Sequence, residues 1–215
     1  MFFYHLFNVI LRFLFRIFLR CHITGLENVP KEGPFIVVIN HTSFLDAAMV
    51  GAFIPREIVL MGKAEVFYYP VLNVLAWLYG AFPVRRGEVD RRAVRRAEEV
   101  LRDGRGLVMA PEGTRSKTGG LQRARHGAAL IALRTGAPIL LVAMWGGKKF
   151  WANLAHLRRT EVEMRIAEPI TLSPPEGVLG REVLRTMTEE IMCSLAALLP
   201  PEYRGVYTEG ARTTK

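Results

Sequence analysis

The sequence predicts a single α/β domain in which helices flank a mostly parallel, mixed central sheet. The chain has 215 residues, the length of one good-sized domain. Short apolar runs typical of buried strands alternate along it with longer segments of helical periodicity. Polar motifs follow the apolar runs at 35–39 and 106–110. In α/β sheets, such motifs at the carboxyl ends of strands are where ligands bind.

Composition and charge narrow the range of partners. Hydrophobic residues make up 50% of the chain and charged residues 23%, and the mean hydropathy is +0.17. The hydrophobic fraction and the mean hydropathy are high for a soluble domain, and they indicate association with a membrane. The 29 Lys and Arg residues outnumber the 20 Asp and Glu residues, giving a formal net charge of +9. This surplus favours an anionic partner such as lipid headgroups or a phosphorylated substrate. Nucleic acid ranks last, because the Arg residues are spread without a recognised nucleic-acid fold.

The N-terminal residues 2–20 predict an amphipathic helix that anchors the protein to a membrane. Placed on a helical wheel, the polar residues fall within an arc of about 120°, and the rest of the circumference is apolar. The residues of this arc are His5, Asn8, Arg12, Arg16 and Arg20. A signal peptide is not expected, because its positive charge precedes the apolar run. A helix lying in the interface, with its Arg side chains against lipid phosphates, avoids the cost of carrying them through hydrocarbon. The alternative is a core helix with a polar stripe.

The remaining elements are predicted in order after a loop whose turn signals lie between Gly25 and Pro34. Apolar or alternating runs predict strands at 35–39, 57–61, 82–85, 106–110, 138–144 and 161–166. Helical spacing predicts helices at 43–53, 66–78, 89–102, 123–135 and 179–198. Residues 66–84 carry no formal charge, so the helix within them is a second candidate for lipid contact. We therefore expect an anchor at 1–22, a domain at 23–200 and a loose polar tail at 201–215.

His41 and Asp46 are the first candidates for catalysis. His41 follows the strand at 35–39, and Asp46 lies about one turn into the next helix. A carboxylate there can accept a hydrogen bond from one ring nitrogen and leave the other nitrogen as a general base. The chain has no Gly-x-Ser-x-Gly motif, so the nucleophile can belong to the substrate, for example a bound alcohol that attacks a thioester. The alternative is structural, because Ser43-x-x-Asp46 also has the form of a capping box.

The segment from Pro111 to Ser116 is the second candidate site. Its Gly113, Thr114 and Arg115 can offer backbone N–H groups, a hydroxyl and a guanidinium to an anion. Glu112 can bind a substrate hydroxyl or orient Arg115. The alternative is an ordinary surface turn.

Further cations and aromatic residues have two interpretations each. Arg85 and Arg86 can reach the same sheet edge and neutralise a phosphate, or form a solvated pair, and Lys63 has the same alternatives. Trp145, Lys148, Lys149, Phe150 and Trp151 are typical of a membrane-interface belt or, for the tryptophans, of core packing. The cysteines, Cys21 and Cys193, imply neither a metal site nor a disulfide framework, so a reducing, cytosol-facing location is expected.

Taken together, these segments resemble the glycerolipid acyltransferases. The run from Asn40 to Asp46 matches their Asn-His-x-x-x-x-Asp block, and 80–85 looks like their Phe-x-x-Arg block. The run from Pro111 to Ser116 matches the third block, and Pro138 is similar to the fourth. The resemblance covers roughly residues 25–170, with Ala110 as a departure where many members have Phe. The subgroup most like this chain is that of the bacterial 1-acyl-sn-glycerol-3-phosphate acyltransferases.

This resemblance implies a function in phospholipid biosynthesis. It implies acyl transfer from acyl-CoA or acyl-carrier protein, without a cofactor or metal, to the 2-hydroxyl of 1-acyl-glycerol-3-phosphate (lysophosphatidic acid), giving phosphatidic acid. His41 would be the base, held by Asp46, with no acyl-enzyme. Arg85, Arg115 and Lys63 would hold the acceptor phosphate, and Glu112 and Gly113 would line the acceptor pocket. The protein would be monotopic or peripheral on the cytoplasmic face of a bacterial membrane.

Three alternatives stay open. An acyltransferase whose acceptor is glycerol 3-phosphate, a glycolipid or another lysolipid would use His41 as the same base. A thioesterase would use His41 to activate water, but would not need phosphate-binding arginines. A non-catalytic lipid-binding protein would keep its membrane binding after His41→Ala and show no turnover.

Overall fold

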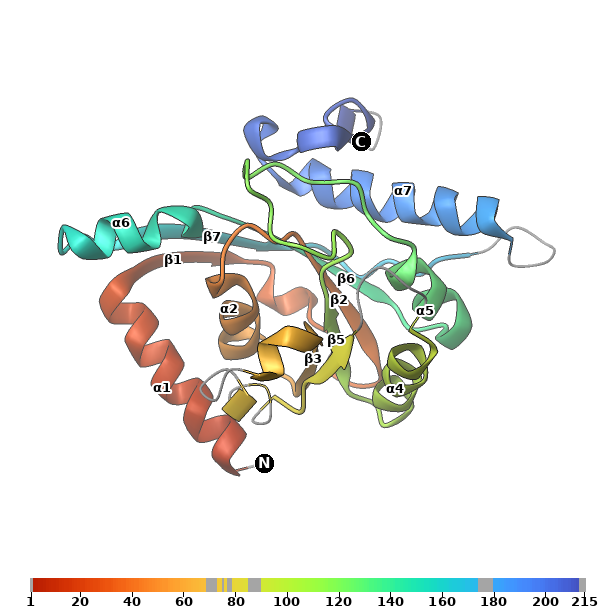
Figure 1. The fold of residues 1–215 in the computed structure, drawn as a ribbon, viewed down its shortest axis with the longest axis horizontal. Helices are drawn as coiled ribbons and strands as arrows, with labels where there is room; N and C mark the ends of the chain where they lie inside the picture. Colours follow the sequence, from red (N-terminus) through yellow and green to blue (C-terminus); the bar gives the residue numbers. More distant parts are fainter. Residues whose placement is uncertain are drawn as a thin grey trace.

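The computed structural model describes residues 2–68, 73–74, 76, 79–84, 90–173 and 180–212. Within them, seven strands form one sheet in the order β1-β7-β6-β2-β5-β3-β4 (Figure 1). The strands are β1 (Leu19–Thr24), β2 (Phe35–Ile39), β3 (Ile58–Lys63), β4 (Phe82–Val84), β5 (Gly106–Met109), β6 (Ile139–Trp145) and β7 (Thr160–Ile166). Strands β2 to β6 run parallel to one another, whereas β7 pairs antiparallel with β6 and parallel with β1. The predicted α/β domain with a mostly parallel, mixed sheet is confirmed.

Helices cover both faces of this sheet because its central strands are apolar on both sides. The helices are α1 (Phe2–Phe18), α2 (Leu45–Phe53), α4 (Arg91–Arg102), α5 (Gly127–Thr135), α6 (Phe150–Ala155) and α7 (Arg181–Leu198). All five residues of β2 are buried: Ile36 and Val38 pack with α4, α5 and α7, whereas Phe35, Val37 and Ile39 pack with α1 and α2. The alternation follows from the strand period of two. Figure 1 shows the two helical layers on either side of the sheet.

Helix α1 packs on the domain with part of its polar arc facing inward, which corrects the predicted orientation. Asn8 is buried and its side chain accepts a 2.5 Å hydrogen bond from the Tyr79 hydroxyl. The Nε of Arg12 donates to the carbonyl of Ala52 at the end of α2. Phe15 belongs to the core. These two polar side chains therefore form hydrogen bonds within the protein. The opposite side of the helix, which is wholly apolar, faces outward.

The outward side of α1 exposes seven large apolar side chains. They are Leu6, Val9, Ile10, Phe13, Leu14, Ile17 and Phe18. We call these seven residues the α1 apolar face. Among the described residues, none of the helices combines the length and the hydrophobicity that crossing a bilayer requires.

Several element boundaries differ from the prediction. The residues after α1 form strand β1 on the sheet edge instead of a loop, so the predicted boundary at residue 22 falls inside a strand. Helix α6 was not predicted. Much of the predicted helix at 66–78 and Arg85 lie outside the described residues.

The C-terminal segment is ordered, contrary to the predicted loose tail. It forms 3₁₀ turns at Pro201–Tyr203, Gly205–Tyr207 and Gly210–Arg212. Tyr207 is buried, and its hydroxyl accepts a hydrogen bond from the backbone N–H of Ala124 at 3.0 Å. Backbone hydrogen bonds also join Leu121 to Tyr203 and Val206. These few contacts fasten a polar segment over the loop that follows β5.

Candidate active site

The two predicted motifs meet at the carboxyl edge of the sheet. Strands β2 and β5 are parallel neighbours, with Val38 opposite Met109, so their following loops emerge side by side. The β2 loop leads to α2 on one face and the β5 loop leads to α5 on the other. Ligands of α/β proteins bind in the crevice at such a divergence. His41 lies in the first loop and Glu112 in the second.

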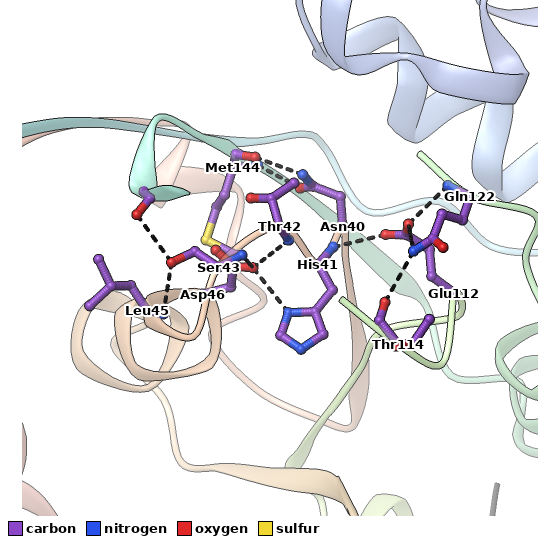
Figure 2. A network of polar contacts seen from close by, with 11 residues as sticks. Asn40, His41, Thr42, Ser43, Leu45, Asp46, Glu112, Thr114, Gln122 and Met144 are labelled. Carbon is purple, nitrogen blue, oxygen red and sulfur yellow. Dashed lines mark hydrogen bonds and ion pairs between the residues drawn. The ribbon is translucent and has the colours of Figure 1, made fainter. Parts of the chain in front are cut away.

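His41 and Asp46 form the predicted pair. The Nδ1 of His41 lies 3.0 Å from Oδ2 of Asp46, and the imidazole side chain is 20% exposed while the carboxylate is 4% exposed. A carboxylate can only accept, so Nδ1 carries the proton and Nε2 is left as an acceptor. In Figure 2 the ring extends away from Asp46 with its other nitrogen on the far side. This geometry suits a general base.

Asp46 also holds the loop around His41. Its Oδ2 accepts hydrogen bonds from the backbone N–H groups of Thr42 at 2.8 Å and Ser43 at 2.7 Å. The Ser43 hydroxyl in turn accepts from the N–H of Leu45 at 3.2 Å. The capping interpretation is therefore correct in part, because one carboxylate orients the imidazole and also shapes the loop that begins α2.

Asn40 fixes the start of the same loop. Its buried side-chain amide donates to the carbonyl of Met144 at 2.6 Å and accepts from the Met144 N–H at 2.7 Å. The side chain thus extends the β2–β6 ladder by one pair (Figure 2). The sequence reasoning gave Asn40 no role of its own, although a polar residue directly after a fully buried strand was a signal for one.

Glu112 is a positioning residue and not, in this structure, an open ligand. It is 5% exposed, and its Oε1 accepts from the backbone N–H of His41 at 2.8 Å. Its Oε2 accepts from the N–H of Gln122 at 2.9 Å. Burial raises the pKa of Glu112, while the hydrogen bonds from His41 and Gln122 act in the opposite direction. The backbone N–H of Ser116 donates to the carbonyl of His41 at 2.7 Å, so the loop after β5 holds the main chain of His41 on both sides.

The middle of that loop faces outward. Thr114 and Arg115 are exposed, between the buried Glu112 and Ser116. Gly113 adopts φ +70°, a left-handed conformation that favours glycine, and an added Cβ would lie 3.2 Å from Nε of Arg125. Thr114 and Arg115 are therefore placed to offer donors to an anion, whereas the Gly113 N–H already donates to the carbonyl of Ala110 at 3.0 Å. The guanidinium stem of Arg125 lies beside them, which the sequence reasoning missed.

The other predicted cations lie farther along the same edge. Lys63 ends β3, the neighbour of β5 on the side away from β2. It stands opposite Val84, the last residue of β4, in the parallel register. Arg85 itself is outside the described residues. The carboxyl edge of the parallel strands thus carries His41 and Glu112, in the loops after β2 and β5, and Lys63, the last residue of β3.

The family comparison matches this part of the chain. A family model described as Acyltransferase matches residues 20–145, a range that includes His41, Asp46 and the whole loop from Pro111 to Ser116. A chloroplastic 1-acyl-sn-glycerol-3-phosphate acyltransferase of Brassica napus is 31% identical over 160 residues, covering 71% of this chain and 46% of the relative. A 1-acyl-sn-glycerol-3-phosphate acyltransferase of Borreliella burgdorferi is 29% identical, covering 60% of this chain and 52% of the relative. The chain thus spans about half the length of these two relatives.

Two further similarities extend over more of the chain. A lyso-ornithine lipid O-acyltransferase of Pseudomonas aeruginosa is 29% identical over 191 residues, covering 80% of this chain and 71% of the relative. The crystal structure of the 1-acyl-sn-glycerophosphate acyltransferase PlsC from Thermotoga maritima superposes with a TM-score of 0.67 at 29% sequence identity. That match covers 86% of this chain and 74% of the crystal structure.

Proposed function

The chain belongs to the acyltransferase family, and from this membership we propose that it is an enzyme that acylates a lysophospholipid. The acceptor we propose is 1-acyl-glycerol-3-phosphate and the product phosphatidic acid. The observation that carries the proposal is the His41–Asp46 pair, with a basic nitrogen left free at the sheet edge it shares with the loop from Pro111 to Ser116.

The proposed reaction is a direct transfer without an acyl-enzyme. Nε2 of His41 takes the proton of the acceptor 2-hydroxyl as its oxygen attacks the thioester carbonyl carbon. The tetrahedral intermediate then expels the thiolate, which takes the proton from the imidazolium as the C–S bond breaks. Asp46 holds the ring and stabilises the imidazolium charge. Heavy-atom bonds form and break only within the two substrates, and His41 carries one proton between them, so the step uses no protein nucleophile or cofactor.

Cations of the same edge are proposed to hold the acceptor phosphate. Arg115 is exposed on the loop that holds His41, and Lys63 ends the next strand. Arg85 is proposed as a third ligand, on the basis of the sequence motif alone. A guanidinium group can bind phosphate through two parallel hydrogen bonds. Such bidentate binding would position the glycerol hydroxyl beside Nε2 of His41. The donor we propose is acyl-CoA or acyl-carrier protein.

A second acceptor follows from one of the comparisons. The Pseudomonas aeruginosa relative is named for a lyso-ornithine lipid, an acceptor other than lysophosphatidic acid. The experiment that decides is a series of acceptors in detergent micelles, with kcat/KM measured for lysophosphatidic acid, lyso-ornithine lipid and glycerol 3-phosphate. A preference for lysophosphatidic acid supports the proposal. A preference for lyso-ornithine lipid would reassign the acceptor and the role of Arg115.

Replacing Glu112 by Gln is expected to lower both stability and kcat. Both carboxylate oxygens accept backbone N–H groups, so an amide must turn its NH₂ toward one of these donors. The buried mismatch is expected to reduce the free energy of unfolding by roughly 1–3 kcal/mol. A shift of the His41 main chain is expected to lower kcat by up to about 10²-fold. Urea unfolding and acyl transfer measure the two effects. The control is Glu99→Gln, which changes an exposed ion pair with Arg96; wild-type values for Glu112→Gln would remove its positioning role.

We propose that the α1 apolar face lies in a membrane interface on the cytoplasmic face of the cell membrane. Seven neighbouring exposed apolar side chains on one helix are more than a soluble surface normally carries. The net charge of +9 favours an anionic bilayer. A monotopic position would let both lipid chains stay in the membrane while the hydroxyl and thioester meet at the sheet edge.

Polar substitutions on the α1 apolar face test this location. Deleting the helix would remove Phe15 from the core, so point substitutions are the sharper test. The double variant Phe13→Ser, Ile17→Ser is expected to partition at least about tenfold more weakly to anionic vesicles, because two exposed apolar side chains lose their transfer energy. Its thermal unfolding should match wild type. Val206→Ser, an equally exposed site on the C-terminal segment, is the control; unchanged binding of the double variant would contradict the proposed interface.

A further inference from the structure

The connection between β6 and β7 is an exposed, apolar and cationic segment. It consists of the 3₁₀ turn Gly147–Lys149, helix α6 and the turn that leads to Thr160. None of the residues of α6 is buried, although it contains Phe150 and Trp151. Trp151 is 64% exposed. Phe150 packs in part against the core, so the exposed aromatic side chain of α6 is Trp151.

Leu157 is another exposed apolar residue of this segment. Its side chain is 94% exposed, and its backbone has φ +53°, the one positive value among the described non-glycine residues. Glycine or asparagine is the ordinary choice at such a position after a helix, because a branched side chain is strained there. An exposed and strained leucine is unfavourable in water on both counts. Apolar surroundings outside the chain would remove the first of these two costs.

The charge around these side chains identifies the chemistry of such surroundings. Lys148 and Lys149 precede α6, and Arg158 and Arg159 follow Leu157, while no acidic residue occurs between Gly147 and Thr160. All four cations are exposed. Tryptophan and leucine flanked by Lys and Arg are the pattern of a segment that lies at the surface of an anionic bilayer.

The segment is joined to both α1 and the active-site loop. Arg159 donates to the carbonyl of Arg16 at 2.6 Å and to that of Leu19 at 2.5 Å, which ties the turn to the end of α1. In Figure 1, α6 lies at the same end of the sheet as the C-terminal end of α1.

On the other side, Phe44 of the His41 loop stacks on Trp151 with ring centroids 5.3 Å apart. The Ser43 hydroxyl also donates to the carbonyl of Gly147 at 3.3 Å. The orientation of α6 thus affects the loop that carries the catalytic pair.

We propose that residues 148–158 are a second membrane-contact element, which places Trp151 and Leu157 in the interface of an anionic bilayer and, through Phe44, holds the His41 loop at that interface. This inference rests on the membrane location proposed above. It adds a contact that is separate in sequence from α1 and adjacent to the site. Two contacts with the membrane would fix the orientation of the domain, whereas the α1 contact alone would hold the domain there without fixing its orientation.

The test is vesicle binding by Leu157→Asn in the full-length chain. Asparagine tolerates the left-handed conformation, so this variant is expected to unfold at the wild-type temperature or above it. Its partition to vesicles of phosphatidylglycerol and phosphatidylcholine is expected to be about tenfold weaker than that of wild type. Val206→Asn, which places the same polar side chain at an exposed apolar site on another part of the surface, is expected to bind like wild type.

Trp151 gives a second and independent readout. Difference spectra between wild type and Trp151→Phe isolate its emission from that of the other two tryptophans. On addition of vesicles this emission is expected to shift to shorter wavelength and to be quenched by brominated lipid tails. No shift and no quenching, with wild-type protein bound, would overturn the proposal.

The outcomes separate this inference from the proposed function. Equal vesicle binding by Leu157→Asn and wild type would overturn the second contact and leave the α1 interface in place. Equal binding with a raised KM for the acyl donor would also overturn it, and would assign Leu157 to binding of the acyl donor. Failure of wild type to bind vesicles at all would overturn both this inference and the proposed membrane location, while acyl transfer in micelles would still report on the reaction.

Discussion

The substitution His41→Ala is expected to reduce kcat for acyl transfer by about 10²- to 10⁴-fold, the range that a positioned general base contributes. The 2-hydroxyl of the acceptor is a poor nucleophile until its proton is taken, and Nε2 of His41 is the nitrogen left free to take it. The ring is partly exposed and lies in a loop held through its main chain by Glu112 and Ser116, so the fold should survive. Acyl transfer in micelles measures kcat, and circular dichroism measures the unfolding temperature.

The matched control for this substitution is His22→Ala, which removes an exposed imidazole from the edge strand β1. It is expected to leave kcat unchanged. If His41→Ala kept turnover within a few-fold of wild type, His41 would not be the base, and another group would have to take the hydroxyl proton.

The substitution Asp46→Asn is expected to lower kcat by about 10²- to 10⁴-fold, and by no more than His41→Ala does, because the carboxylate acts through the imidazole. The amide is nearly the same size, and its oxygen can still accept from the N–H groups of Thr42 and Ser43. The charge that stabilises the imidazolium is lost. We therefore expect the unfolding temperature and KM to change little while kcat falls. The control is Asp103→Asn, a surface carboxylate paired with Arg105.

A double variant tests whether Asp46 acts on turnover through His41 or independently of it. Because Asp46 acts through His41, the double variant His41→Ala, Asp46→Asn should be about as slow as His41→Ala alone. Independent, multiplicative losses would show that Asp46 contributes by another route. Unchanged turnover in Asp46→Asn alone would reduce Asp46 to the cap of α2.

The sheet and the meeting of the two motifs were predictable from sequence for a physical reason. Strands β2 and β6 are buried on both faces, so they read as continuous apolar runs with sharp ends. Once the parallel sheet is assumed, its carboxyl edge must bring the residues after β2 and β5 together. Because His41 and Glu112 follow these two strands, the sequence predicts that they lie at one site.

Elements with little local signal were missed. Strand β1 begins directly after α1, contains Arg20 and His22, and buries only alternate residues, so it resembled the end of a helix followed by a loop. None of the residues of helix α6 is buried, and Phe150 packs only in part against the core, so the helix has no clear periodic pattern. The C-terminal segment depends on single contacts such as Tyr207 with Ala124, which lie too far apart in sequence to be seen in it.

Orientation and partners were the other limit. The helical wheel of α1 locates a polar arc but does not show which side of the helix meets the domain. The partner of Asn8 is Tyr79, 71 positions away, and the partner of Arg12 is Ala52, 40 positions away. Both carboxylate oxygens of Glu112 accept hydrogen bonds from backbone N–H groups, which a sequence does not reveal, and its role as a substrate ligand stays a prediction.

The most direct test of the central claim is the identity of the product that wild-type protein forms from labelled acyl-CoA and lysophosphatidic acid in detergent micelles. Direct transfer predicts labelled phosphatidic acid as the main product, formation that depends on the acceptor, and no labelled protein at any time. Free fatty acid as the main product in the presence of the acceptor would make the protein a hydrolase and contradict the proposed function. Label bound covalently to the protein would contradict the proposed mechanism.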